Sequence, residues 1–179
     1  MDLHPLTVET IPAAAEVARR IWPRSYAEVL SPEQIDYQLS QRTSEAFFRS
    51  YLDDPDRGYD LAVSGDRVIG YCSYHLASVD ELRLDQIYVD PDLHGQGFGQ
   101  QLLDHVRGIA TRRSVQRISL TVNRGNVKAI TFYRHRGFSV VDDVVMDIGG
   151  GFVMDDHIMV APVVPSTPAP TGGAAADGG

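Results

Sequence analysis

Three glycines at alternating positions are the feature of this 179-residue sequence that points most directly to chemistry. Gly95, Gly97 and Gly99 stand in the stretch LHGQGFGQQLL, between a segment with strand periodicity and one with helical periodicity. The first N–H groups of a helix have no partner inside the helix and carry partial positive charge. Glycines let an anion approach those groups closely. Strand, glycine-rich loop and helix in this order therefore predict a pyrophosphate site built from backbone donors.

Two well-known nucleotide motifs fit this stretch poorly. The dinucleotide fingerprint needs G-x-G-x-x-G and an acid after the following strand, but here the spacing is G-x-G-x-G and that strand ends in Val122 and Asn123. A P-loop needs Lys and then Ser or Thr after its last glycine, where this chain has Gln100 and Gln101. The pyrophosphate therefore belongs to a different kind of ligand.

A second pair of residues lies further along the chain, in NVKAITFYRHR. Asn126 and Tyr133 are seven positions apart, so they lie two helical turns from each other and can face one cleft. A tyrosine hydroxyl has a reference pKa of about 10 and is protonated at neutral pH. Tyr133 can therefore act as a proton donor.

Taken together, the stretches LDQIYVDPDLHGQGFGQQLL and LTVNRGNVKAITFYRHRGF resemble the GCN5-related N-acetyltransferases (GNAT), which bind acetyl-coenzyme A. The first is similar to the family's pyrophosphate loop, Q/R-x-x-G-x-G/A, and the second to its N-x-x-A-x-x-F-Y-x-x-x-G-F segment. The resemblance covers roughly residues 60 to 160, and the flanking IWPRSYAEVLSPEQIDYQL and IGGGFVMDDHIM are similar to a bacterial subgroup of polyamine-type or N-terminal acetyltransferases. His94 departs from the pattern, because the family usually has Gln or Arg there.

The resemblance implies a set of coenzyme-binding residues on the strand, the loop and the later helix. In it, the Ile87 amide polarises the thioester carbonyl, Val89 pairs with the pantetheine arm, Asn126 touches the coenzyme and Tyr133 protonates the departing thiolate. The full set comprises Ile87, Tyr88, Val89, His94, Gly95, Gln96, Gly97, Phe98, Gly99, Asn126 and Tyr133.

The general base is not identified by the resemblance. Arg83 occupies the strand position where some members of the family carry a catalytic Glu, and Arg cannot accept a proton. Glu81 and Asp85 flank it at two-residue spacing, so both are candidates, directly or through water. No metal is expected, because His75, His105, His135 and His157 share no metal-ligand spacing.

The implied activity is direct acetyl transfer from acetyl-CoA to a primary amine of a small molecule. The net charge of -8 favours a cationic acceptor and argues against nucleic-acid binding. Asp142, Asp143, Asp155 and Asp156 are expected in solvated turns and edges, or alternatively at the rim of a cation-selective acceptor site. Peptide or protein N-acetylation, and a sensor or interaction module that binds acetyl-CoA without turnover, are the alternatives.

The elements that must position these residues follow from periodicity. Amphipathic or capped helices are expected at residues 11–22, after Ser31 with Gln34 completing a capping box, and after Ser44. A hairpin turning near Gly65 precedes the strand ELRLDQIYVDP, in which Leu82, Leu84 and Gln86 should face one way and Ile87 and Val89 the other. The fold class is α/β with a mixed sheet. The resemblance implies a mostly antiparallel sheet flanked by helices, with a splayed pair of parallel strands.

Length and composition indicate a single domain over residues 1–160 and a disordered Pro/Gly/Ala-rich tail over 161–179. Cys72, the only cysteine, is expected to be buried and inert in a strand. No apolar run is long enough to span a bilayer and the N-terminus does not read as a signal peptide, so a cytoplasmic protein is expected. A homodimer is compatible with the family resemblance.

Overall fold

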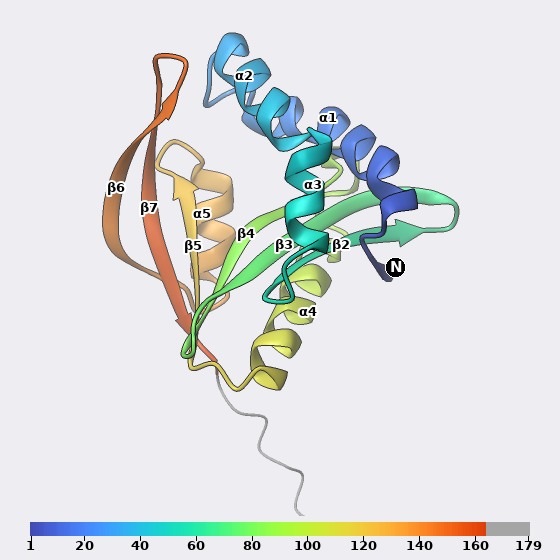
Figure 1. Ribbon diagram of the computed structural model, residues 1–179. Coiled ribbons are helices and arrows are strands. Elements are labelled where there is room, and N and C mark those ends of the chain that lie inside the picture. Colours follow the sequence, from blue (N-terminus) through green and yellow to red (C-terminus); the bar gives the residue numbers. More distant parts are fainter. Residues whose placement is uncertain (164–179) are drawn as a thin grey trace, which may run out of the picture.

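A computed structural model describes residues 1–163 and shows a seven-stranded sheet in the order β1-β2-β3-β4-β5-β7-β6 (Figure 1). All neighbouring strands are antiparallel except β4 and β5, which are parallel. The strands are β1 Asp2–Pro5, β2 Arg57–Ser64, β3 Arg67–Ser78, β4 Glu81–Val89, β5 Arg117–Asn123, β6 Ser139–Gly149 and β7 Phe152–Pro162. The predicted mixed sheet with one parallel pair is confirmed.

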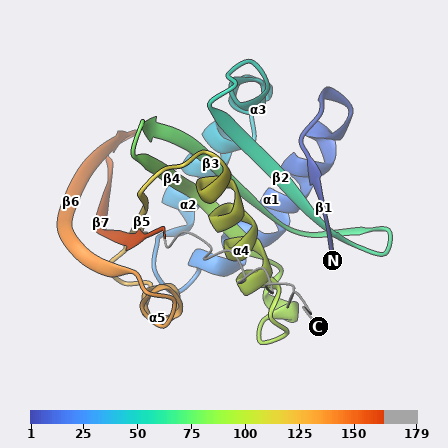
Figure 2. The same cartoon turned by 90° about the horizontal axis from the view of Figure 1, so that it is seen from below.

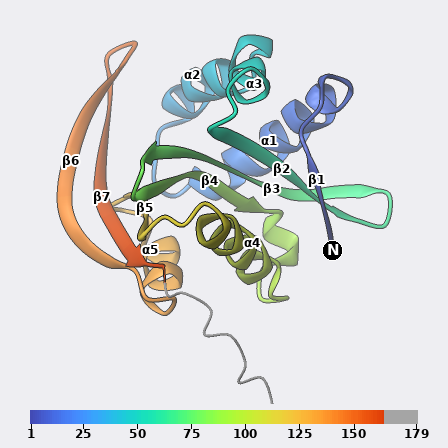
Figure 3. The ribbon, with the colours of Figure 1, turned by 60° about the horizontal axis from the view of Figure 1, so that its bottom comes forward.

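The helices form two layers, one on each face of the sheet (Figures 2 and 3). They are α1 Ile11–Tyr26, α2 Pro32–Arg42, α3 Glu45–Leu52, α4 Phe98–Arg112 and α5 Val127–Arg134, with short 3-10 turns η1 Val8–Thr10 and η2 Pro91–Leu93. α1, α2 and α3 cover one face, and α4 and α5 cover the other. Each layer buries its own apolar cluster against the sheet, which is the main favourable term for a fold of this type.

Local sequence signals explain where the helices begin. The hydroxyl of Ser31 accepts from the Gln34 amide at 3.2 Å, and that of Ser44 accepts from the Phe47 amide at 3.2 Å, so both serines are N-caps as predicted. The capping box at Gln34 is wrong, because its side-chain amide donates to the Val153 carbonyl at 2.8 Å. Gln34 therefore joins α2 to β7 instead of closing its own helix.

Two elements near the chain ends differ from the sequence analysis. β1 was not predicted, since the short run DLHP carries a proline and little apolar pattern, yet it pairs with β2 as an edge strand. At the other end, Ala161 and Pro162 are the last residues of β7, and Ala161 is 2% exposed. The tail therefore cannot begin at residue 161, and its remainder from residue 164 onward lies outside the described residues.

A β-bulge in β4 overturns the predicted facing of that strand. Ser73 of β3 is opposite Gln86 and Tyr74 is opposite Leu84, so Asp85 has no partner in the ladder. One extra residue reverses the alternation of the residues that follow it. Leu82, Leu84, Ile87 and Val89 consequently all belong to one apolar cluster on the α4 side, whereas Gln86 bonds to Ser73 on the opposite side.

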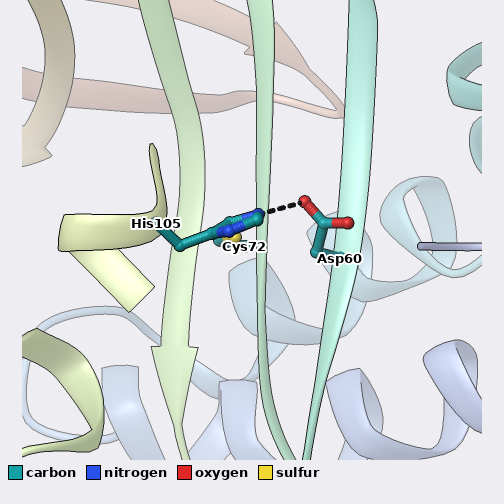
Figure 4. A group of neighbouring side chains, drawn as sticks. All are labelled: Asp60, Cys72 and His105. Carbon is teal, nitrogen blue, oxygen red and sulfur yellow. Dashed lines mark hydrogen bonds and ion pairs between the residues drawn. The ribbon is translucent and has the colours of Figure 1, made fainter. Parts of the chain in front are cut away.

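The sheet and α4 are also joined by a buried polar group (Figure 4). Asp60 of β2, Cys72 of β3 and His105 of α4 place their polar atoms within 4.8 Å of one another. The Asp60 Oδ2 atom lies 2.9 Å from His105 Nε2 and accepts from the Tyr74 hydroxyl at 3.0 Å. Sequence spacing did not reveal this cluster because its members come from three elements.

The Asp60–His105 and Asp60–Tyr74 distances are those of hydrogen bonds, and they connect α4 to β2 and β3 beneath it. Cys72 is fully buried as predicted, and burial raises the pKa of its thiol well above the usual value. The thiol therefore stays neutral beside the carboxylate. The cluster holds the helix that follows the glycine loop.

We expect Asp60→Ala to lower the free energy of unfolding by about 1–3 kcal/mol, because it leaves the half-buried Tyr74 hydroxyl and His105 without their acceptor. Urea unfolding followed by circular dichroism measures the change. Glu28→Ala is the control, since it breaks an exposed ion pair with Lys128 and such pairs contribute little. Equal effects of the two substitutions would contradict the structural role of Asp60.

Candidate functional site

A cleft opens where the two parallel strands separate. β4 and β5 pair only at Glu81 with Arg117, Leu82 with Ile118, and Arg83 with Ser119. Beyond those positions a narrow cavity of about 50 Å³ lies between the strands and is closed by α5 and the end of α1. It is lined by Tyr26, Leu84, Asp85, Gln86, Ile87, Tyr88, Leu120, Thr121, Val122, Asn126, Ala129 and Tyr133.

The edge of β4 that faces this gap carries backbone groups with no strand opposite. The Asp90 amide donates to the Ile69 carbonyl of β3 at 2.8 Å. Because hydrogen-bonding direction alternates along an antiparallel strand, Tyr88 pairs toward β3 whereas Ile87 and Val89 direct their N–H and C=O groups toward β5. Ile87 thus lines the cleft, and Val89 follows it on the same open edge of β4, outside the lining residues.

The His94 side chain hydrogen-bonds to one of these backbone groups, the Val89 carbonyl. Its Nε2 atom lies 3.1 Å from the Val89 carbonyl oxygen, which can only accept, so the ring carries its proton on Nε2 in this contact. The His94 side chain therefore folds back on the strand end. The Ile87 N–H, the Ile87 C=O and the Val89 N–H at this open edge have no partner strand within residues 1–163.

The glycine loop leads directly into α4. Gly95 and Gly97 have φ angles of 81° and 84°, in the left-handed region that favours glycine, and Gly97 is the N-cap of the helix. The first backbone bond of the helix runs from the Gln101 amide to the Gly97 carbonyl. Residues 1–163 provide no acceptor for the N–H groups of residues 95–100, and the first turn of α4 contains no acid. Such an array suits an anion.

A buried carboxylate fixes the start of this loop. Asp90 is 0% exposed and forms ion pairs with Arg20 and Arg24 of α1 and with Arg67 of β3, the shortest at 2.7 Å. It also accepts from the Asp92 amide at 3.2 Å and so caps η2. The chain between β4 and the glycines is therefore anchored to α1.

The structure brings Asn126 and Tyr133 into the same cavity, as predicted from their spacing. Asn126 is the N-cap of α5 and accepts from the Ala129 amide at 3.1 Å. The Tyr133 side chain is buried, and its hydroxyl makes no hydrogen bond to any of residues 1–163. Burial raises the pKa of Tyr133 far above its usual value, so the hydroxyl keeps its proton at all physiological pH values.

The two candidate bases are in different places. Asp85 lines the cavity at the bulge of β4. Glu81 sits where the strands still pair, accepts from Ser119 at 2.5 Å and forms an ion pair with Arg117 at 2.7 Å. The Ser119 hydrogen bond and the Arg117 charge hold the pKa of Glu81 below its usual value. Arg83 bonds to the Thr121 hydroxyl at 3.2 Å across the strands.

Two residues near the cleft or the glycine loop were not singled out from the sequence. Thr121 lines the cavity beside Tyr88, which was in the expected set, and Arg136 bonds to Gln100 in the first turn of α4. Asp156 is only 4% exposed, so the expectation of a solvated edge is wrong for this residue, and burial raises the pKa of its carboxyl. The alternation of apolar and polar residues in LTVN was the sequence signal that could have placed Thr121 on the cleft side of β5. The burial of Asp156 has no such local signal, because it depends on α2 lying over β7.

Comparison with known proteins agrees with this geometry. Residues 15–138 match the sequence pattern of the Acetyltransferase (GNAT) family. An uncharacterized N-acetyltransferase of Mycobacterium tuberculosis is 29% identical over 150 residues, which is 84% of this chain and 96% of that protein. The spermidine N(1)-acetyltransferase of Thermoplasma acidophilum is 23% identical over 159 residues, covering 87% of this chain and 96% of the relative.

A solved structure shares the fold. The PaiA N-acetyltransferase from Thermoplasma acidophilum in complex with coenzyme A superposes with a TM-score of 0.76 and 23% sequence identity, covering 90% of this chain and 99% of that one. No helix within residues 1–163 has both the length and the apolar character needed to cross a membrane.

Proposed function

The chain belongs to the GNAT family of N-acetyltransferases, and on this basis we propose that it transfers acetyl directly from acetyl-CoA to a primary amine of a small cationic molecule. The observation that carries the proposal is that the open edge of β4 and the buried side chain of Tyr133 line one cavity. The N–H groups of residues 95–100, which have no partner among residues 1–163, follow β4 directly in the chain.

The residues present fit the coenzyme. Its pyrophosphate would bind the N–H groups of residues 95–100 together with the dipole of α4, and Arg136 beside Gln100 adds a positive charge that His94 does not guarantee. The pantetheine arm would lie along β4, using the Val89 N–H and the Ile87 C=O as a neighbouring strand does. The Ile87 N–H would then polarise the thioester carbonyl, which is the electrophile that the coenzyme supplies.

The proton transfers require one base and one acid. Asp85 reaches the cavity and can accept the proton of the attacking amine, directly or through water, whereas Glu81 is held by Arg117 and Ser119 at the closed end of the cleft. Tyr133 keeps its proton because of burial and would donate it to the departing thiolate. Asn126 contributes its side-chain amide on the coenzyme side.

The charge of the acceptor follows from the carboxylates around the cleft. The chain carries a net charge of -8, Asp85 lines the cavity, and the Oδ1 atom of buried Asp156 has no partner among residues 1–163. An ammonium group would satisfy such an oxygen. The named activity of the Thermoplasma relative, on spermidine, is of this class.

A thiol-release assay with acetyl-CoA and a panel of amines tests the proposal. We expect turnover with polyamines or amino sugars, and a KM for the acceptor that rises with salt, because surface fields are screened over about 8–10 Å near physiological ionic strength. Exclusive turnover of peptide N-termini would replace the proposed acceptor with a protein one. Coenzyme binding without thiol release for any amine would refute the enzymatic proposal.

The loop is expected to bind through its backbone, so Gly97→Ala should weaken acetyl-CoA binding at least about 10-fold by forcing the left-handed N-cap to change. Gly65→Ala is the matched control, because Gly65 also has a positive φ and open space around it but lies in the β2–β3 turn. His94→Arg should preserve or tighten binding. Calorimetry that finds equal affinity for the Gly97 and Gly65 variants would refute backbone binding.

Tyr133→Phe removes one hydroxyl and keeps the ring, so acetyl-CoA affinity should change little. We expect kcat to fall by roughly 10²- to 10⁴-fold, the usual contribution of a positioned proton donor. Steady-state kinetics with the best amine measure the loss. Tyr37→Phe serves as the control, since it deletes a hydroxyl bonded to the Ile148 carbonyl outside the cavity. Full kcat in Tyr133→Phe, with chemistry limiting, would assign the acid to another group.

A further inference from the structure

Asp85 has a second connection that leads out of the cleft. Its Oδ2 atom lies 2.9 Å from Nδ1 of His75 in β3 and accepts from the hydroxyl of Tyr51 in α3 at 3.3 Å. The bulge makes this possible, because it removes Asp85 from the ladder between β3 and β4. The carboxylate that lines the cavity is thus bonded to a histidine that does not line it.

His75 borders a separate opening on the protein surface. This second cavity has a volume of about 280 Å³ and is lined by Asp54, Asp56, Arg57, His75 and Leu76. The His75 side chain is 33% exposed and that of Asp85 is 18% exposed. Nδ1 therefore meets Asp85, while Nε2 has no hydrogen bond to any of residues 1–163 and the ring lines the second cavity.

We propose that His75 relays the proton that Asp85 takes from the amine and releases it to solvent through this second cavity. The inference rests on the proposed acetyl transfer. At rest the Nδ1–H of neutral His75 donates to the Asp85 carboxylate. When Asp85 has taken the proton of the amine, exchange with water moves the ring proton from Nδ1 to Nε2 and leaves Nδ1 free to accept. The Asp85 carboxyl then gives its proton to Nδ1 while Nε2 releases its proton to water, which restores the carboxylate and the original tautomer of the ring. The proton gained at Nδ1 equals the proton lost at Nε2.

Other histidine–carboxylate pairs lack these two connections. His105 bonds to Asp60 beneath α4, and neither residue lines the cleft. His157 and Asp143 pair at 2.5 Å on the β6–β7 hairpin, also outside the residues that line the cleft. Within residues 1–163, the His75–Asp85 pair links the catalytic cavity to a second opening, which a purely structural pair does not require.

The charges around His75 suit a proton exit. Arg57 of β2 and Arg83 of β4 are its partners in the sheet register, one on each side. Asp54 and Asp56 line the outer cavity, where their carboxylates can receive the released proton. Acceptors for the released proton therefore lie in the same outer cavity as the His75 ring.

The experiment compares His75→Asn with the wild-type enzyme and with His157→Asn. Asn retains a donor near the position of Nδ1, and so keeps Asp85 in place, but it cannot carry a proton through. We expect kcat to fall about 10-fold or more with acetyl-CoA affinity unchanged, less than the roughly 10²- to 10⁴-fold contribution of a direct base. His157→Asn changes an equivalent pair outside the cleft and should leave kcat unchanged.

Chemical rescue separates a relay from a merely structural residue. The second cavity is large enough for imidazole, so added imidazole should raise kcat of His75→Ala in proportion to its concentration and leave the wild type unaffected. A His75→Asn enzyme with wild-type kcat, or a His75→Ala enzyme without rescue, overturns the relay while the acetyltransferase proposal stands. A wild-type enzyme that releases no thiol with any amine overturns both.

Discussion

The separation of β4 from β5 after Arg83 and Ser119 is the constraint on which the rest of the site depends. A strand that loses its neighbour inside a protein exposes N–H and C=O groups that must find other partners. Here Ile87 and Val89 lose theirs, and the ligand is expected to replace the missing strand segment. The cavity and the side chains on α5 lie at this interruption of the ladder, and the loop before α4 follows β4 directly in the chain.

A single inserted residue gives β4 two different roles. On the α4 side, Leu82, Leu84, Ile87 and Val89 form a continuous apolar surface in spite of their irregular spacing. On the other side, Asp85 leaves the ladder and meets His75 and Tyr51. The bulge therefore lets one strand support the core and supply a carboxylate to the cleft. Without it, the same sequence would place either the apolar residues or the acid on the wrong face.

Signals local in the chain were sufficient to predict the glycine loop, the caps at Ser31 and Ser44, and the alignment of Asn126 with Tyr133. Each of these depends on residues a few positions apart. Three other features depend on strand register or on α2 or α3 lying over the sheet, and so on residues distant in the chain. They are the facing of Ile87, the burial of Asp156 and the pairing of Asp85 with His75. Periodicity assumes an unbroken ladder, so it gives the wrong face after a bulge. Family resemblance supplied the splayed strands, which no pattern within β4 or β5 reveals.

The ion pairs around Asp90 make the residues of this cluster unequally tolerant of substitution. Three guanidinium groups, from Arg20, Arg24 and Arg67, converge on this one buried carboxylate. Loss of any single arginine leaves two cations to compensate the charge, whereas loss of the carboxylate leaves three like charges facing one another. Genetic drift can therefore alter the arginines one at a time, while position 90 stays closed to substitution. Among the residues that hold the start of the glycine loop, the carboxylate is thus less tolerant of substitution than each of the arginines that pair with it.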